Sequence, residues 1–239
     1  MIDNTMITIS NITFDGLWIG MEIFYGSNLS LEGTNLIDNS AAYGLSLRFG
    51  STIYGDSALE IINSANTGIM LGYNSTAWVP SLSSSYNGQE GLYLWASSSL
   101  WGTNANYSNN ASNGLHTSRN SSAGIENSTI SSNGAYGLKN RGSYISASNS
   151  TISNNGSSGV NNGYLASFGC SNCTLTGNTQ AGIASYGNSM SYISGGTISN
   201  NGNYGIHNYW SGFVYESGIT YSSNPSGNVQ TNGDGSYTY

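Results

Sequence analysis

Large apolar side chains are sparse in this sequence, but they recur at a regular interval. Nine of them directly follow a glycine and so mark a repeat: Gly20-Met21, Gly44-Leu45, Gly68-Ile69, Gly91-Leu92, Gly114-Leu115, Gly137-Leu138, Gly159-Val160, Gly182-Ile183 and Gly205-Ile206. Successive anchor glycines are 22–24 residues apart. Because such periods are typical of solenoids, the pattern predicts a stack of similar units, with a degenerate tenth unit near Gly227.

Two further columns keep a fixed distance from the anchor glycines. Seven residues earlier the column is mostly large and apolar: Ile37, Ile61, Ser84, Tyr107, Ile130, Ile152, Leu175 and Ile198. Four residues earlier, six consecutive units have an asparagine: Asn87, Asn110, Asn133, Asn155, Asn178 and Asn201. If each unit is one coil, equal offsets stack about 4.8 Å apart. The apolar residues then form a continuous core, and the amides hydrogen-bond from coil to coil as an Asn ladder.

The residue types within each unit distinguish between the kinds of solenoid fold. Short segments rich in Ile, Thr, Ser and Tyr between Gly and Asn are typical of strands, whereas helical repeats need about 33 or more residues. Asn-Gly pairs also favour hairpins, but a meander would not stack the same Asn. We therefore expect an all-β chain with one parallel β-helix domain over 1–239. Nine to ten coils of 22–24 residues cover about 10–222, and 223–239 form a degenerate coil or tail.

The units "NSTISNNGSSGV" and "GGTISNNGNYGI" carry a family resemblance. With an Asn ladder in coils of about 23 residues, they resemble the right-handed parallel β-helix of the pectate-lyase-like superfamily. That group includes polysaccharide lyases and hydrolases, viral tailspikes and fibres, and bacterial surface adhesins. The resemblance implies a single-stranded right-handed solenoid, most similar to a tail fibre, tailspike or adhesin. It leaves the activity open, because one fold hosts many functions.

A stripe of aromatic and arginine residues lies four or five positions after the anchors. Its candidate carbohydrate-binding members are Tyr73, Trp95, Arg119, Arg141, Tyr164, Tyr186, Tyr209 and Trp210. Rings pack on the apolar faces of sugars while polar groups bond their hydroxyls, so the stripe predicts a carbohydrate platform. The alternative interpretation is that these rings, like the aligned pair Trp78 and Trp101, stack only for stability.

Three of the four cationic side chains fall in two adjacent units. His116 and Lys139 accompany Arg119 and Arg141 there. The group is either a solvated patch or a site for an acidic sugar or another anion.

Two acidic residues and two cysteines give weaker signals. Glu32 and Asp56 share one offset in adjacent units, and glycoside hydrolysis uses two carboxyls about 5–10 Å apart. They are the candidates for catalysis, although they lie on a different edge from the stripe. Cys170 and Cys173 form one C-x-x-C, for which a local disulfide and free thiols both stay open.

The overall composition limits the classes of partner that we expect. The net charge is −7 with four Lys and Arg residues, and duplex binding needs several phosphate neutralisations, so we expect no nucleic acid partner. The sequence contains no run of about 18 apolar residues, so it predicts no membrane span. No secretory signal peptide is recognisable. No pattern predicts a cofactor or metal, since C-x-x-C alone lacks a second ligand pair.

We expect a non-catalytic β-helix, extracellular or on a virion, that binds cell-surface polysaccharide. The alternatives are a self-assembling structural surface or filament protein and a polysaccharide-degrading enzyme of the tailspike type. The aromatic stripe favours binding, and the lack of a carboxylate groove disfavours the enzyme. An uncovered last coil exposes unpaired backbone groups and apolar side chains. We therefore also expect a homo-oligomer, trimeric if viral, or a longer parent chain.

Overall fold

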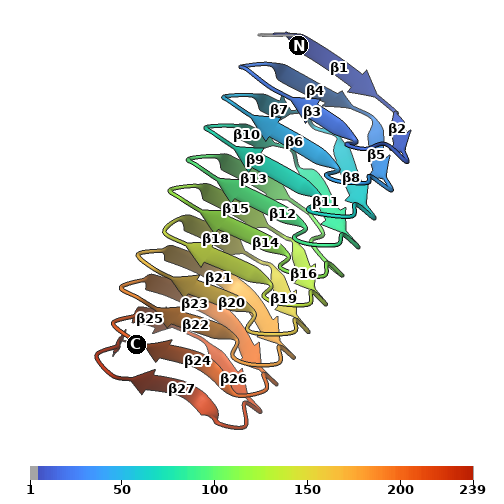
Figure 1. Cartoon of the computed structure of the whole chain (residues 1–239). Helices are drawn as coiled ribbons and strands as arrows, with labels where there is room; N and C mark the ends of the chain where they lie inside the picture. The colour runs from blue at the N-terminus through green and yellow to red at the C-terminus, as the bar shows by residue number, and fades with distance from the viewer. Residues whose placement is uncertain (1–4, 239) are drawn as a thin grey trace.

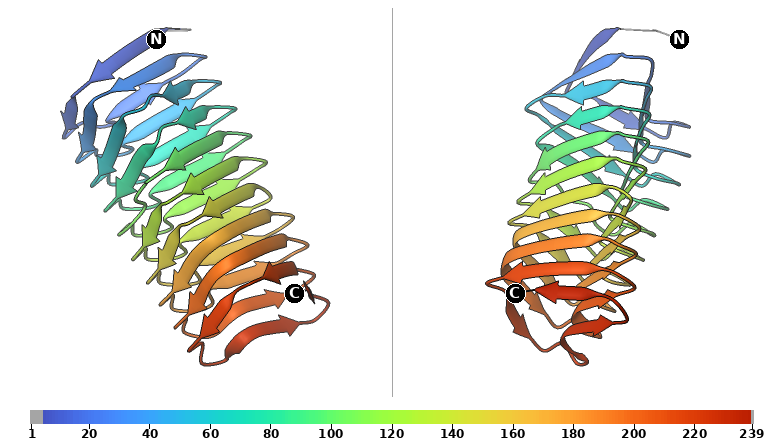
Figure 2. Two further views of the ribbon diagram at one scale, coloured as in Figure 1. Left: turned by 180° about the vertical axis from the view of Figure 1, so that it is seen from behind. Right: turned by 90° about the vertical axis from the view of Figure 1, so that its left-hand side faces the viewer.

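The computed structural model describes residues 5–238, which form an elongated stack of β-coils (Figure 1). The amino-terminal coil lies at one end and the carboxyl-terminal coil at the other, and no α-helix occurs between residues 5 and 238. Strands of successive coils pair in parallel on each face (Figure 2). The predicted all-β parallel solenoid of about ten coils is therefore confirmed.

One face, sheet C, contains the strands that begin near the anchor positions. Its ten strands are β3 (Met21–Ile23), β6 (Leu45–Arg48), β9 (Ile69–Gly72), β12 (Leu92–Trp95), β14 (Leu115–Ser118), β17 (Leu138–Arg141), β20 (Val160–Gly163), β22 (Ile183–Tyr186), β24 (Tyr204–Tyr209) and β27 (Gly227–Asn232). Leu92 pairs with Ile69 on one side and Leu115 on the other. Equal offsets in the repeat therefore stack directly, as the spacing predicts.

The second face, sheet A, follows sheet C in each coil. Its main path contains β1 (Met6–Ser10), β4 (Asn28–Glu32), β7 (Thr52–Tyr54), β10 (Thr76–Trp78), β13 (Ser99–Thr103), β15 (Ser122–Glu126), β18 (Tyr144–Ser148), β21 (Ser167–Thr176), β23 (Met190–Ser199), β25 (Phe213–Ser217) and β28 (Ser236–Thr238).

The third face is divided between two sheets. Sheet B contains β2 (Thr13–Asp15), β5 (Thr34–Asp38), β8 (Ala58–Ile62) and β11 (Ser81–Ser85). Further along, β16 (Thr129–Ser131), β19 (Thr151–Ser153) and β26 (Thr220–Ser222) belong to sheet A, because they pair with each other or with the long strands β21 and β23. A disulfide between Cys170 and Cys173 lies within β21.

The core is built from the apolar columns of the repeat. The column seven residues before the anchors is fully buried throughout: Ile37, Ile61, Ser84, Tyr107, Ile130, Ile152, Leu175 and Ile198. Each apolar side chain is covered by the coils above and below, so a few per coil suffice for one continuous core.

The Asn ladder is confirmed. Asn87 Nδ2 donates to Asn110 Oδ1 at 2.9 Å, and the Asn87 backbone N–H donates to the same oxygen at 3.1 Å. The amide–amide bonds continue at 2.9–3.0 Å as far as Asn201. The second amide hydrogen goes to a backbone carbonyl, as from Asn133 Nδ2 to Tyr107 O at 3.0 Å. Buried amides are thereby satisfied on both atoms.

The ladder has one more member than the repeat predicts. Asn201 Nδ2 donates to Asn224 Oδ1 at 3.2 Å. Asn224 lies three rather than four residues before Gly227, and this one-residue shift hides it from a fixed-offset reading.

A second polar column runs inside the stack and was not predicted. Three residues after the anchors, the amino-terminal coils have Leu71 and Leu94, but the following coils have Thr117, Asn140 and Asn162, all buried. Thr117 Oγ1 donates to Asn140 Oδ1 at 2.8 Å, and Asn140 Nδ2 donates to Asn162 Oδ1 at 3.0 Å. The core therefore changes from purely apolar to partly hydrogen-bonded along the stack.

Candidate functional site

The stripe residues sit where sheet C turns toward sheet A. In coil after coil two consecutive residues of this turn have left-handed backbone angles, as in Tyr73 and Asn74 (φ 55° and 63°) and in Arg119 and Asn120 (φ 54° and 61°). Residues other than Gly, Asn and Asp seldom adopt this conformation. The turn places the stripe side chains along one edge of the stack.

The amino-terminal half of the stripe is a continuous ring stack. Tyr25 stacks on Phe49 with ring centroids 5.1 Å apart, and Phe49 stacks on Tyr73 at 4.7 Å. Tyr73 meets the Trp95 ring edge-on at 4.4 Å. Phe49 lies five residues after Gly44, at a stripe position, but it was not among the predicted binding residues.

A second ring stack occupies the carboxyl-terminal half. Tyr164 contacts Tyr186 edge-on at 5.3 Å, and Tyr186 stacks on Tyr209 at 5.2 Å. Trp210 lies 6.3 Å from Tyr164. Because aromatic pairs at these separations are attractive, the stripe contributes to stability whatever else it does.

Two arginines fill the gap between the ring stacks. The Arg119 guanidinium lies 5.5 Å from the Trp95 ring, and the Arg141 guanidinium lies 4.6 Å from the Tyr164 ring. Both side chains are exposed. Among residues 5–238 the one contact within 4 Å between a carboxylate and a basic side chain joins Glu90 and His116, so neither guanidinium has a carboxylate partner there.

The arginines line two adjoining clefts over sheet C, of about 500 and 450 Å³. We call the two clefts together the cationic groove. Its lining residues are Tyr43, Arg48, Phe49, Met70, Tyr73, Tyr93, Trp95, His116, Ser118, Arg119, Arg141, Gly142 and Tyr164. Tyr93 and Arg119 belong to both clefts, which makes the groove continuous.

His116 is held at the floor of the groove. Its ring stacks on Tyr93 at 4.6 Å, and its Nδ1 lies 3.6 Å from Glu90 Oε1. Glu90 also accepts hydrogen bonds from Thr67 Oγ1 and Asn113 Nδ2, at 3.2 and 3.3 Å. The pKa of Glu90 lies below its usual value mainly because of the neighbouring His116 ring, while burial acts in the opposite direction.

Glycines let two stripe rings lie flat on the strand before them. A Cβ on Gly72 would lie 2.3 Å from Trp95 Nε1, and a Cβ on Gly163 would lie 2.4 Å from Tyr186 Cζ. The Tyr186 hydroxyl also donates to Asn161 Oδ1 at 3.0 Å. Both rings are therefore fixed by packing and half-buried.

The structure brings together only part of the predicted site. Tyr73, Trp95, Arg119, Arg141, Tyr164 and His116 line the cationic groove. Tyr209 lines a separate small cleft with His207 and Tyr136. Lys139, Tyr186 and Trp210 line neither the cationic groove nor this small cleft. Lys139 pairs in register with His116 on the neighbouring strand.

Several groove residues were missed by the sequence reading. Tyr93 and His116 share the position two residues after the anchors, so a column at that offset was a readable signal. Met70 has that same offset, and Ser118 has the offset of Trp95 and Arg141. Nothing in the spacing indicates that Tyr43 reaches the groove, because the way side chains lean across strands is not encoded in the period.

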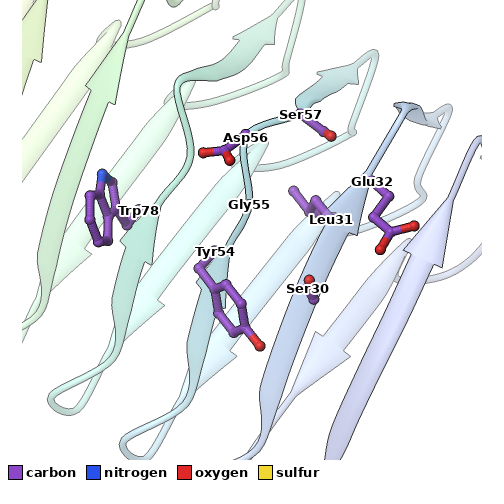
Figure 3. A pocket seen from close by; sticks show the side chains of 8 residues that line it. All are labelled: Ser30, Leu31, Glu32, Tyr54, Gly55, Asp56, Ser57 and Trp78. Carbon is purple, nitrogen blue, oxygen red and sulfur yellow. The ribbon is translucent and has the colours of Figure 1, made fainter.

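Glu32 and Asp56 lie elsewhere, in a cleft of about 390 Å³ beside sheet A (Figure 3). We call it the sheet A cleft; it is lined by Ser30, Leu31, Glu32, Tyr54, Gly55, Asp56, Ser57 and Trp78. In Figure 3 the Asp56 carboxylate points toward the Trp78 side and the Glu32 carboxylate points away from it. The two carboxylates do not face each other, and their catalytic role stays a prediction.

Neither a metal site nor a membrane-spanning helix is found in the described part of the chain. No group of three or more His, Cys, Asp or Glu side chains between residues 5 and 238 is arranged to hold a metal ion. The same residues include no helix with the length and apolarity to cross a bilayer.

Comparison with known proteins gives a family and several structural neighbours. The family model described as "Right handed beta helix region" matches residues 1–143 and 52–195. A search of curated protein sequences gave no match.

Three solved structures with the same fold illustrate the neighbours. The A-module of the Azotobacter vinelandii mannuronan C-5 epimerase AlgE4 is 18% identical, with a TM-score of 0.58 over 100% of this chain and 79% of that one. The periplasmic alginate epimerase AlgG is 14% identical (TM-score 0.59; 95% of this chain, 51% of that chain). Pectate lyase Pel9A is 12% identical (TM-score 0.61; 93% and 70%). At these identities the likeness concerns the fold.

Proposed function

The chain belongs to the family of right-handed β-helix regions, and within it we propose a carbohydrate-binding protein whose cationic groove holds an anionic polysaccharide. The polymer lies across the strands of sheet C. Its sugar rings pack on Tyr73, Trp95 and Tyr164, and its acidic groups meet Arg119 and Arg141.

The unpaired arginines carry this proposal. In a protein of net charge −7, two exposed guanidinium groups lie next to one groove, and no carboxylate between residues 5 and 238 pairs with either. Guanidinium binds carboxylate and sulfate-type oxygens through paired, charge-assisted hydrogen bonds. An anionic ligand would supply the counter-charge that the protein itself does not.

The flanking rings add specificity for a sugar rather than a small inorganic anion. Each guanidinium is bordered by a stripe ring, Trp95 for Arg119 and Tyr164 for Arg141. Alternation of rings and cations suits a chain of pyranose units that carry acidic groups. The structural neighbours support this direction, since their names concern mannuronan, alginate and pectate.

The proposal extends to the setting of the protein. We propose an extracellular or virion-surface location, where cell-surface polysaccharide is exposed. We further propose that the chain works as a homo-oligomer, trimeric if it is part of a viral fibre, or within a longer chain.

Titration calorimetry with alginate and polygalacturonate hexamers tests the binding role, with neutral dextran oligomers beside them. We expect the acidic hexamers to bind and Arg119→Ala and Arg141→Ala each to weaken them about tenfold, the loss of one charge-assisted contact of about 1.5 kcal/mol. Lys139→Gln is the matched control, because it removes one positive charge from a residue outside the groove lining. Equal losses in all three variants, or no binding of either hexamer, would overturn the proposal.

A second candidate function is a polysaccharide-modifying or -degrading enzyme, favoured by one observation. The His116 ring borders the groove, stacked on Tyr93 and 3.6 Å from Glu90 Oε1, and His is the most frequent general acid–base residue. Both ring nitrogens are buried, so this function requires a movement that exposes one of them to the sugar. Prolonged incubation with both hexamers, followed by mass and NMR analysis of the sugar, separates the two functions. Turnover that is abolished in His116→Gln would identify an enzyme, and unchanged sugar would leave a binding protein.

A further inference from the structure

The outer face of sheet A has its own aromatic column, separate from the stripe. Tyr54, Trp78 and Trp101 are register partners on the adjacent strands β7, β10 and β13. The two indoles are 61% and 46% exposed and meet edge-on at 5.9 Å. Large aromatic rings displayed to water at neighbouring positions mark binding surfaces more often than ordinary surface.

A built cleft adjoins this column (Figure 3). It forms because the chain bends at Gly55, whose φ is +149° and where a Cβ would lie 2.4 Å from Leu31 O. The bend follows β7 directly and turns the Asp56 carboxylate toward Trp78 in Figure 3. A ring platform and a carboxylate acceptor therefore border one cavity of about 390 Å³.

The chemistry of this cleft is the opposite of that of the cationic groove. Its lining contains two carboxylates, Glu32 and Asp56, and no Lys, Arg or His. All four Lys and Arg residues lie in strands of sheet C or directly after one. The negative carboxylates of the cleft repel an acidic sugar. They accept hydrogen bonds from the hydroxyl groups of an uncharged sugar, and charge-assisted bonds of this kind are strong.

We propose that the sheet A cleft is a second carbohydrate site, which binds an uncharged sugar residue. One face of the pyranose packs on Trp78, and two hydroxyls donate to the Asp56 carboxylate. This site depends on no residue of the cationic groove, so it stands or falls independently of the function proposed above.

Tryptophan fluorescence and calorimetry with cellohexaose, maltohexaose and chitohexaose (the N-acetylated form) test the proposal. We expect at least one hexamer to bind the wild-type protein, Trp78→Ala to weaken it at least tenfold, and Asp56→Asn to weaken it about threefold. Trp18→Ala is the matched control, because Trp18 is 74% exposed and lies outside the cleft. The control should bind as the wild type does.

Two comparisons complete the test. Arg119→Ala/Arg141→Ala should bind the neutral hexamer unchanged, which distinguishes this site from the groove. Circular dichroism should show unchanged folding of Trp78→Ala, since its side chain is mostly exposed. If no neutral hexamer binds at millimolar concentration, or if Trp78→Ala binds it as tightly as the Trp18→Ala control, the proposal is wrong.

Discussion

Replacing Asn155 by alanine removes one member from the middle of the Asn ladder. Its Nδ2 donates to Asn178 Oδ1 at 2.9 Å, and its Oδ1 accepts the Asn133 Nδ2 and backbone N–H at 2.9 and 3.1 Å. In the variant, Asn133 Nδ2 keeps its bond to Tyr107 O. The Asn133 backbone N–H loses its acceptor in a site closed to water.

The magnitude follows from the buried donors of Asn133, its backbone N–H and one Nδ2 hydrogen, that lose Asn155 Oδ1. An unsatisfied buried polar group costs about 1–3 kcal/mol, so we expect the free energy of unfolding of Asn155→Ala to fall by that amount. For a chain of this size each kcal/mol corresponds to about 2–4 °C in melting temperature. Equilibrium urea unfolding, followed by circular dichroism, measures the loss.

Asn203→Ala is the control for the ladder experiment, because its side chain is exposed two residues after ladder residue Asn201. Exposed substitutions usually change stability by less than about 0.5 kcal/mol. A loss in Asn155→Ala no larger than in this control would refute the ladder as a source of stability.

Three other outcomes follow from the structure. The pKa of Glu90 is lowered from 4.5, so its stabilising contribution is present above pH 4.5 and is lost as the pH falls through the lowered value. The wild type should therefore lose more stability between pH 7 and pH 3 than Glu90→Gln does. An equal loss in both proteins would contradict this. Gly72→Ala should destabilise the protein by about 1–3 kcal/mol through overpacking against Trp95, and the effect should nearly vanish in a Trp95→Ala background; an undiminished loss would mean that the ring is not what resists the methyl group. Sedimentation at micromolar concentration should show an oligomer, and a stable monomer with protected terminal coils would disprove self-association.

The period of the sequence predicts the fold and the ladder because both depend on equal offsets. When coils stack, residues one period apart become neighbours, so Asn110 must meet Asn87 and Asn133. Asn224 was not predicted as a ladder member because the segment between it and Gly227 is one residue shorter than in the other coils. A rule based on fixed offsets fails wherever a coil changes length.

The candidate site was less predictable, because it depends on how side chains lean. The stripe positions were readable, including Gly72 at the offset of Trp95 and the two arginines between aromatic residues. The period does not show that the Trp95 ring leans onto Gly72, or that the Arg119 and Arg141 guanidinium groups lie against the Trp95 and Tyr164 rings. The polar interior formed by Thr117, Asn140 and Asn162 was also overlooked. In the sequence it appears only as a change of residue type three positions after the anchors.

The Asn ladder has a direction, and this constrains any assembly that would extend it. Each amide–amide bond of the ladder, from Asn87 to Asn201, donates toward the carboxyl-terminal coil. The first oxygen, Asn87 Oδ1, accepts from the Ser64 backbone N–H, and the last amide, on Asn224, donates back to Ile198 O. A twofold axis between two stacks would set equivalent ends against each other, donor facing donor or acceptor facing acceptor. Only a head-to-tail contact continues the row, and such contacts produce open filaments when they do not close into a ring. A filament that prolonged the ladder would therefore be polar, with two chemically different tips and one distinguishable direction of growth.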